Sequence, residues 1–178
     1  MRRYALLRLS DMNKPKHTIL FHKVLTLQRS LSANPGFETA GAGGTDVFAD
    51  WTETETLGTS TIEQAIDSVN TGTYACKLTH GDTLVLVSQE HVVIPGKLYQ
   101  LSFYTRGDGT NGGRYRIRDV TGATNIVGIT DTGVTGTSYV LVQKKFVTPA
   151  GCTALGIDLL DGGAGFVYFD DVYVSPVN

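Results

Sequence analysis

The feature that most constrains the fold is a repeated unit in which a short apolar run ends at a cluster of Gly, Asp or Asn. The runs occupy residues 45–56, 61–66, 73–79, 83–94, 97–106, 113–120, 125–130, 138–148, 154–160 and 165–175. Short strands spaced roughly a dozen residues apart are typical of an antiparallel sandwich or jelly roll. Within these runs the pattern allows a single helical turn at residues 64–68, and residues 17–28 are expected to be a strand or an extended arm, with a short helix as the alternative. The sequence therefore predicts an all-β fold, an antiparallel β-sandwich of the jelly-roll type.

The runs on both sides of residues 107–113 alternate between apolar and polar side chains. The apolar set is Tyr99, Leu101, Phe103, Tyr115 and Ile117. The polar set includes Tyr104, Arg106, Arg114, Arg116 and Arg118. A period of two predicts that one face of each strand lies in the core and the other in water. The Gly-rich segment 107–113 is expected to be a hairpin loop, which would make the two strands neighbours.

The first 31 residues differ in charge from the rest of the chain. They hold seven Lys and Arg against Asp11 alone, a charge of +6, so the total of −2 leaves −8 for the remainder. The candidate partner-binding residues in this segment are Arg2, Arg3, Arg8, Lys14, Lys16, Phe21, Lys23 and Arg29. Disordered tails seldom alternate charges with so many aliphatic residues. We therefore expect residues 1–32 to be an extended arm that docks on another subunit, and residues 33–178 to be the jelly-roll domain.

Several classes of protein are disfavoured by the sequence. The apolar runs near the N-terminus are interrupted by charged residues, unlike the core of a secretion signal. No stretch approaches the ~18 apolar residues of a membrane span. Cys76 and Cys152 do not make a disulfide framework, and without Cys-x-x-Cys spacing they do not indicate zinc.

Five segments, in this order, carry a family resemblance. They are residues 34–38 followed by Trp51, then residues 72–78, 95–103, 146–151 and 167–172. Together they resemble the galactose-binding-like jelly rolls among the carbohydrate-binding modules of xylanases and cellulases. The resemblance covers about residues 33–175 and implies the fold. It leaves open sugar binding or use as a structural module.

The resemblance also implies a structural calcium ion. Carried over to this chain, Glu38 and Asp170 would be its carboxylate ligands, completed by backbone carbonyl groups. Hard oxygen ligands from distant segments suit Ca²⁺, which accepts irregular geometry. The alternative is that Asp170 and Asp171 cap a strand and that Glu38 is solvated.

Two sets of residues are candidates for glycan or anion binding. Modules that bind sugars stack exposed aromatic rings on them, and Tyr104 and Tyr139 are the candidates here, because Trp51 resembles a core residue of the family. A basic stripe is expected where Arg106 adjoins the next strand, and its members are Arg106, Arg114, Arg116 and Arg118. Such a stripe can bind an acidic surface or phosphate, or it can be a solvated face paired with the surplus carboxylates.

No catalytic constellation stands out. Asp158, Asp161, Asp170 and Asp171 lie beside Gly or at expected strand ends, and no nucleophile motif or metal-binding His pair is present. We therefore expect a protein that is not an enzyme.

The main functional hypothesis is a virion structural protein, a capsid decoration or head or tail accessory protein of a tailed phage. It would be made in the host cytoplasm and assemble in many copies with other virion subunits. The alternative is an extracellular carbohydrate-binding module that binds polysaccharide or a cell-surface glycan. Nucleic-acid contact by the arm ranks last, since aliphatic residues alternate with its charges.

Overall fold

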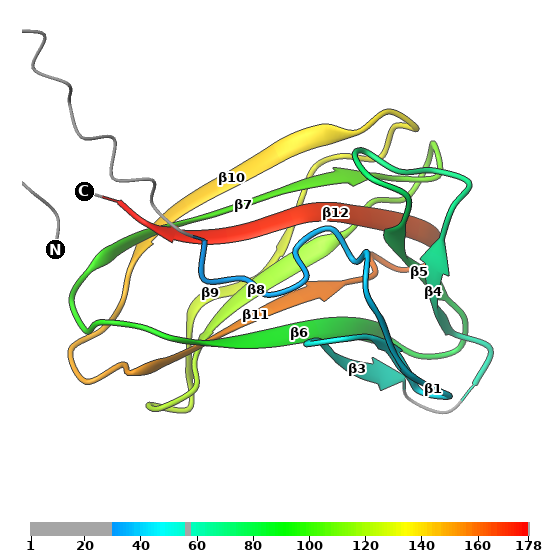
Figure 1. The fold of residues 1–178 in the computed structure, drawn as a ribbon. Coiled ribbons are helices and arrows are strands. Elements are labelled where there is room, and N and C mark those ends of the chain that lie inside the picture. The colour runs from blue at the N-terminus through cyan, green and yellow to red at the C-terminus, as the bar shows by residue number, and fades with distance from the viewer. Residues whose placement is uncertain (1–29, 56–57, 178) are drawn as a thin grey trace, which may run out of the picture.

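Two five-stranded antiparallel sheets pack face to face in this computed structural model, which describes residues 30–55 and 58–177 (Figure 1). The β12 sheet has the order β10 (Val140–Val147), β7 (Leu98–Arg106), β12 (Gly165–Pro176), β5 (Ala75–His80) and β4 (Thr61–Ala65). The β11 sheet has the order β3 (Thr52–Glu55), β6 (Val85–Val92), β11 (Ala154–Leu160), β8 (Arg114–Asp119) and β9 (Thr124–Asp131). A hairpin of β1 (Ala40–Gly43) and β2 (Asp46–Phe48) is added to these.

The core lies between the two sheets and is built from the apolar half of each alternating strand. Phe103 of β7 packs against Tyr115 of β8 and Phe169 of β12, with both pairs of ring centroids 5.7 Å apart. These contacts join the two sheets, because β8 belongs to one and β7 and β12 to the other. Full burial of a large apolar side chain is worth roughly 1.5–3 kcal/mol, so this inner layer is the main stabilising element of the sandwich.

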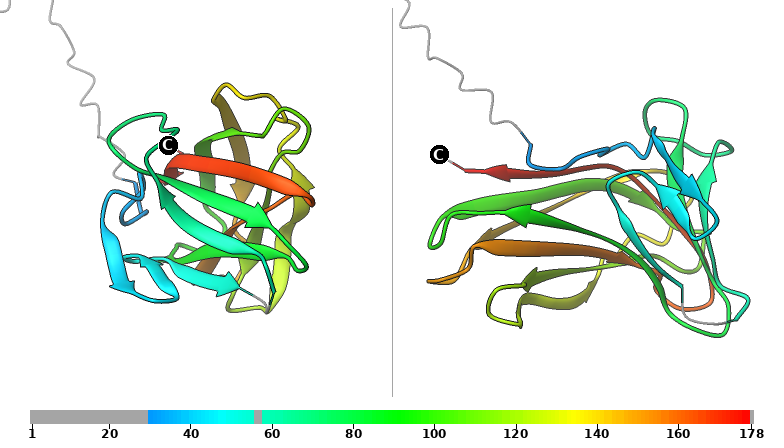
Figure 2. Two further views of the ribbon diagram at one scale, coloured as in Figure 1. Left: turned by 90° about the vertical axis from the view of Figure 1, so that its right-hand side faces the viewer. Right: turned by 60° about the horizontal axis from the view of Figure 1, so that its bottom comes forward.

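The two borders of the sandwich are finished differently. At one border β3 and β4 lie near each other, and β2 of the hairpin contacts both (Figure 2). At the other border β9 and β10 are the outermost strands of their sheets. Strand β10 carries Lys144 and Lys145, and β9 has two irregularities in its pairing with β8. Lysines and bulges are common devices against edge-to-edge association, so this border is protected as an open edge.

Residues 30–35 run beside the second half of β12, where β5 has already ended. The amide of Leu31 donates to the carbonyl of Val174 at 2.7 Å, and the amide of Val172 donates to the carbonyl of Pro35 at 2.8 Å. The domain therefore includes residues 30–32, which the sequence assigned to the arm. The arm residues chosen from the sequence, Arg2, Arg3, Arg8, Lys14, Lys16, Phe21, Lys23 and Arg29, lie outside the described residues.

The predicted fold class is confirmed: the described residues form an antiparallel β-sandwich without a helix. The side chains expected in the core are buried, namely Trp51, Tyr99, Leu101, Phe103, Tyr115 and Ile117. In the turn between β6 and β7, Gly96 has a φ of 70°, which a residue with a side chain rarely adopts. The helical turn expected at 64–68 is wrong, since β4 extends to Ala65 and no helix follows.

A second expectation is corrected by the connection between β7 and β8. Residues 107–113 do not form a hairpin loop within one sheet, because β7 lies in the β12 sheet and β8 in the β11 sheet. The segment crosses from one layer to the other. Its turn is fixed by Asp108, whose carboxylate accepts the amides of Thr110 at 2.8 Å and Asn111 at 2.7 Å.

Candidate functional site

The predicted basic stripe is divided between the two outer faces of the sandwich. Arg114, Arg116 and Arg118 point outward from β8 in the β11 sheet, as the alternation predicts. Arg106 belongs to β7, so it lies on the β12 sheet, and its place in one stripe with the other three was wrong. Alternation fixes which side chains leave the core, but it does not fix which sheet a strand joins.

On the β12 sheet the structure brings Arg106, Tyr139 and Tyr168 together. The Arg106 guanidinium lies 4.3 Å from the centre of the Tyr168 ring and donates to the carbonyl of Thr137 at 3.0 Å. The Tyr139 hydroxyl donates to the carbonyl of Ser68 at 3.0 Å. Burial raises the pKa of Tyr139. Both predicted binding residues are therefore engaged in internal contacts, and Tyr139 ties down the loop that follows β4.

That loop is held over the β12 sheet by further bonds. The Tyr168 hydroxyl is bonded to Asp67 at 2.9 Å, and Asp170 accepts the amides of Asn70 at 2.8 Å and Thr71 at 3.1 Å. Tyr104 lies opposite Asp170 and is half-buried. This outer face is thus covered by its own chain in the region of the predicted tyrosines.

The predicted calcium ligands do come close to each other. A Cβ added to Gly36 would lie 3.6 Å from Cγ of Glu38 and 3.6 Å from Oδ1 of Asp170, so both side chains flank one glycine. Glu38 accepts the amides of Thr73 at 2.9 Å and Tyr74 at 3.0 Å.

Burial raises the pKa of Asp170 to about 6, although backbone amides donate to it. Within residues 30–55 and 58–177, no group of three His, Cys, Asp or Glu side chains could hold a metal ion. Each carboxylate oxygen has two lone pairs. After the bonds to backbone amides, one lone pair is left on Oδ1 of Asp170 and one on Oε2 of Glu38. The donors are hard oxygens of the kind that Ca²⁺ prefers, so the residues fit such an ion in chemistry.

The outer face of the β11 sheet carries polar groups in three rows that cross its strands. The strand register gives these rows as Thr52–Ser88–Asp158–Arg116, Glu90–Gly156–Arg118–Asn125, and Thr54–Leu86–Leu160–Arg114–Asp131. Successive rows are two residues apart along a strand, or roughly 6.6 Å. We call the first two rows the polar band. It presents hydroxyl, carboxylate, amide and guanidinium groups across the sheet.

At the centre of the polar band, one carboxylate binds two arginines. Asp158 is fully buried and accepts Nε of Arg116 at 2.6 Å. Arg118 binds the same carboxylate with Nε at 2.9 Å and with Nη2 at 2.9 Å. The hydrogen bond to Asp158 raises the pKa of Arg118. Both arginines keep about a quarter of their side chains exposed, so they form the floor of the band while remaining accessible.

A glycine gives Arg118 its place on the sheet. A Cβ at Gly156 would lie only 2.8 Å from Nη2 of Arg118 and 2.9 Å from its Cζ. The guanidinium therefore lies against the bare backbone of β11, where any side chain would displace it. Arg114 is held separately, because its Nε donates to Asp131 at 2.8 Å and its Nη2 to the carbonyl of Gly162 at 2.7 Å.

Asp158 is the residue of this site that sequence reasoning missed. It was grouped with aspartates that lie beside a glycine or at a strand end, but it lies in the middle of β11 with Ile157 and Leu159 on either side. A lone carboxylate at a polar position of an otherwise apolar strand was the available signal. Its partners could not be found in this way, because the pairing of β11 with β8 is not written in either strand alone.

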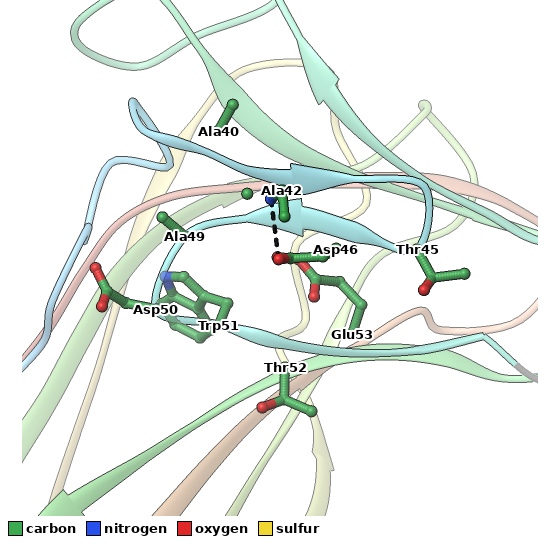
Figure 3. Close-up of a pocket in the computed structure, with 10 residues that line it drawn as sticks. Ala40, Ala42, Thr45, Asp46, Ala49, Asp50, Trp51, Thr52 and Glu53 are labelled. Atoms are coloured by element: carbon green, nitrogen blue, oxygen red, sulfur yellow. Dashed lines mark hydrogen bonds between the residues drawn. The ribbon is translucent and has the colours of Figure 1, made fainter.

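The hollow that borders the β1–β2 hairpin has a volume of about 530 Å³ and is lined by acidic side chains (Figure 3). Asp46 accepts the amide of Ala42 at 2.9 Å, and Glu53 accepts the amide of Phe48 at 2.7 Å. Burial raises the pKa of Glu53. Trp51, which also lines the hollow, is a core residue, with its ring centre 4.9 Å from that of Phe37. Because Asp46 and Glu53 are bonded to backbone amides of β1 and β2, we infer that these carboxylates stabilise the hairpin.

Comparisons with known proteins show what the fold is similar to. No protein-family profile and no curated protein matches the sequence. The structure of TmCBM61 in complex with β-1,4-galactotriose has a TM-score of 0.62 at 21% identity, covering 84% of this chain and 99% of that one.

Two further structures show the same fold. The CBM22-1 xylan-binding domain of Xyn10C from Paenibacillus barcinonensis has a TM-score of 0.57 at 14% identity, over 80% of this chain and 92% of that one. The enzymatically active domain of tailspike protein 4 of bacteriophage CBA120 has a TM-score of 0.61 at 16% identity, over 83% of this chain but only 21% of that one. The fold of this chain is therefore similar to that of these two carbohydrate-binding modules and of part of the tailspike domain. The described residues contain no helix that could cross a membrane.

Proposed function

We propose that this protein is a non-catalytic carbohydrate-binding module that takes a glycan along the polar band of the β11 sheet. The observation that carries the proposal is the band itself, in which donors and acceptors from β3, β6, β11, β8 and β9 share one outer face. Small-molecule sites place a few polar groups in fixed positions to orient their ligand. Asp158 does this for Arg116 and Arg118. Similarity to modules whose structures contain or are named for bound glycans supports the choice of ligand class.

The competing place for a glycan is the β12 face with Tyr104 and Tyr139. Tyr139 is bonded to the loop at Ser68, and Tyr168 next to it is buried beneath Arg106. A sugar could stack there only after displacing the loop. The β11 face needs no such displacement, because Thr52, Glu90 and Asn125 are already exposed.

The proposal is tested by measuring the binding of a panel of soluble polysaccharides to paired variants. Arg116→Ala removes a donor from the polar band, and Tyr104→Ala is its matched control on the opposite face. We expect Arg116→Ala to weaken binding at least about tenfold, the loss typical of a charged hydrogen bond. Tyr104→Ala should bind as the parent does. The opposite pattern would move the site to the β12 face, and no binding to any polysaccharide would contradict the proposed function.

A second candidate is a virion structural role, which the similarity to a phage tailspike domain favours. In that case residues 1–29 would act as an arm on a neighbouring subunit, within a multi-copy assembly. The truncation that tests it should stop before residue 30, because Leu31 is bonded to β12. Loss of assembly with the domain still folded would favour this role. A monomer with or without residues 1–29 would argue against it.

We also propose that Glu38 and Asp170 hold a structural Ca²⁺. The convergence of both side chains on Gly36 and the free lone pairs on hard oxygens support it. An ion that binds only the folded state stabilises it by mass action. Thermal melts with calcium and with a chelator should then differ in midpoint, and Glu38→Gln should abolish the difference. Identical melts would contradict the calcium site.

A further inference from the structure

The centre of the polar band carries more positive than negative charge. Two guanidinium groups share the single buried carboxylate of Asp158, so one positive charge has no carboxylate of its own within the band's centre. Replacing a buried ion pair by packed apolar residues often costs no stability, so such a cluster is weak evidence for a structural role. It holds the two arginines in fixed positions instead.

The donors that are left unused belong mainly to Arg116. It is bonded to Asp158 through Nε alone, whereas Arg118 uses both Nε and Nη2. The two terminal nitrogens of Arg116 have no bond among the described residues. A guanidinium presents its donors in a planar fork that matches the oxygens of a carboxylate or a sulfate.

The charged groups around the band indicate which arginine is available to an anionic ligand. Arg114 is matched by Asp131, with 2.8 Å between Nε and Oδ1. Glu90 lies across Gly156 from Arg118 in the register, and its charge acts on Arg118. Glu90 is exposed, so water screens it. Arg116 is therefore the cation of this face that is least compensated.

We infer that the glycan bound on the polar band is acidic, and that Arg116 binds an oxyanion of the sugar, a uronate carboxylate or a sulfate ester. The inference rests on the proposed function and specifies its ligand class. Asp158 positions Arg116 from below, and Arg118, held flat on Gly156, adds positive charge beside it. Hydroxyls of Ser88 and Thr52 lie in the same row and can bond to the sugar ring.

The test compares polymers that share a sugar backbone and differ in whether they carry anionic groups. Homogalacturonan is measured against its fully methyl-esterified form, and dextran sulfate against dextran, at constant ionic strength. We expect at least about tenfold tighter binding of one acidic polymer than of its neutral partner. The pair that shows the preference identifies carboxylate or sulfate as the group bound. Equal binding of acidic and neutral polymers would overturn the inference while leaving the proposed function intact, and no binding would overturn both.

Variants assign the preference to the named residue. Arg116→Gln should remove the acidic preference, and Arg116→Lys should restore part of it, because lysine keeps the charge but not the planar fork. Arg114→Gln is the matched control, since Arg114 is already bonded to Asp131 and Gly162. Glu90→Gln should tighten binding of the acidic polymer. Polyglutamate binding as tightly as the acidic glycan, and lost in Arg116→Gln, would overturn recognition of a sugar.

Discussion

The two outer faces of the sandwich use their charged and polar side chains in different ways. On the β12 sheet, Asp170 binds backbone amides of residues 70 and 71, and Tyr139 binds the carbonyl of Ser68. On the β11 sheet, the partners of Asp158 among residues 30–55 and 58–177 are the side chains of Arg116 and Arg118. Groups bonded to backbone fix the path of the chain. Groups bonded to other side chains position donors that still face solvent.

This contrast leads to a separation of effects. Substitutions on the β12 face should lower the free energy of unfolding and leave ligand binding unchanged. Substitutions on the β11 face should weaken binding with little change in stability. The inner layer beneath both faces is expected to respond to pH.

The largest effect is expected from acidification, through His91 on the inner face of β6. Burial lowers the pKa of His91 to about 4, from an ordinary value near 6.5. The stability this confers is fully present above pH 6.5 and is lost as pH falls toward 4. The free energy of unfolding should drop by up to about 3 kcal/mol from this residue over that range. Denaturant titrations of the parent and His91→Gln at several pH values measure the difference.

The variant is needed because Asp170 in the β12 sheet works in the opposite direction. Its pKa is raised to about 6, so its protonation favours the folded state as pH falls through that value. Subtracting the His91→Gln curve from the parent curve isolates the imidazole. Parallel curves for the two proteins would contradict a neutral, buried His91.

The next largest effect is expected from Asp170→Ala. The substitution removes the acceptor for the amides of Asn70, Thr71 and Asp171. The loss should be about 2–3 kcal/mol, since bonds to a charged acceptor are strong but the burial cost of the carboxylate is also removed. Asp131→Ala is the matched control on the β11 face, where an exposed ion pair contributes within about 1 kcal/mol. If chemical denaturation gave equal losses of unfolding free energy for the two variants, the proposed difference between the faces would be contradicted.

A smaller effect is expected from Tyr139→Phe, which deletes one hydroxyl. The carbonyl of Ser68 loses its donor, and the free energy of unfolding should fall by about 1 kcal/mol. Tyr104→Phe on the same face should change it by a few tenths of that. Binding of the glycan should be the same in both variants. A large loss of binding in Tyr139→Phe would show that the β12 face contacts ligand.

The smallest change in stability is expected from Arg116→Gln. Asp158 keeps the bonds from Nε and Nη2 of Arg118, so the buried carboxylate stays paired, and the glutamine amide can donate to it in place of Nε of Arg116. The free energy of unfolding should therefore change by less than about 1 kcal/mol. The same variant should lose at least about tenfold in binding to the acidic glycan. A loss of stability comparable with that of Asp170→Ala would make Arg116 a structural residue.

The sequence was sufficient to predict the sandwich, because alternation fixes which side chains leave each strand. Phe103 and Ile117 lie in the core, and Arg116 points outward, as their positions in the pattern require. These are properties of single strands.

The site could not be predicted because it depends on which strands become neighbours. Arg106 and Arg116 are ten residues apart in sequence, yet they lie on opposite sheets because residues 107–113 cross between layers. Asp158 meets Arg116 only through the pairing of β11 with β8, which are distant in the chain. The alternating pattern of one strand holds no information about its partner.

The central claim is that ligand binds to the outer face of the β11 sheet, and backbone amide shifts test it most directly. The protein is titrated with the oligosaccharide of the tightest-binding glycan while its two-dimensional nitrogen–proton NMR spectrum is followed. We predict that the largest shift changes fall on β6, β8 and β11, around Ser88, Arg116 and Asp158. Changes concentrated instead at Tyr104, Tyr139 and residues 66–74 would contradict the account.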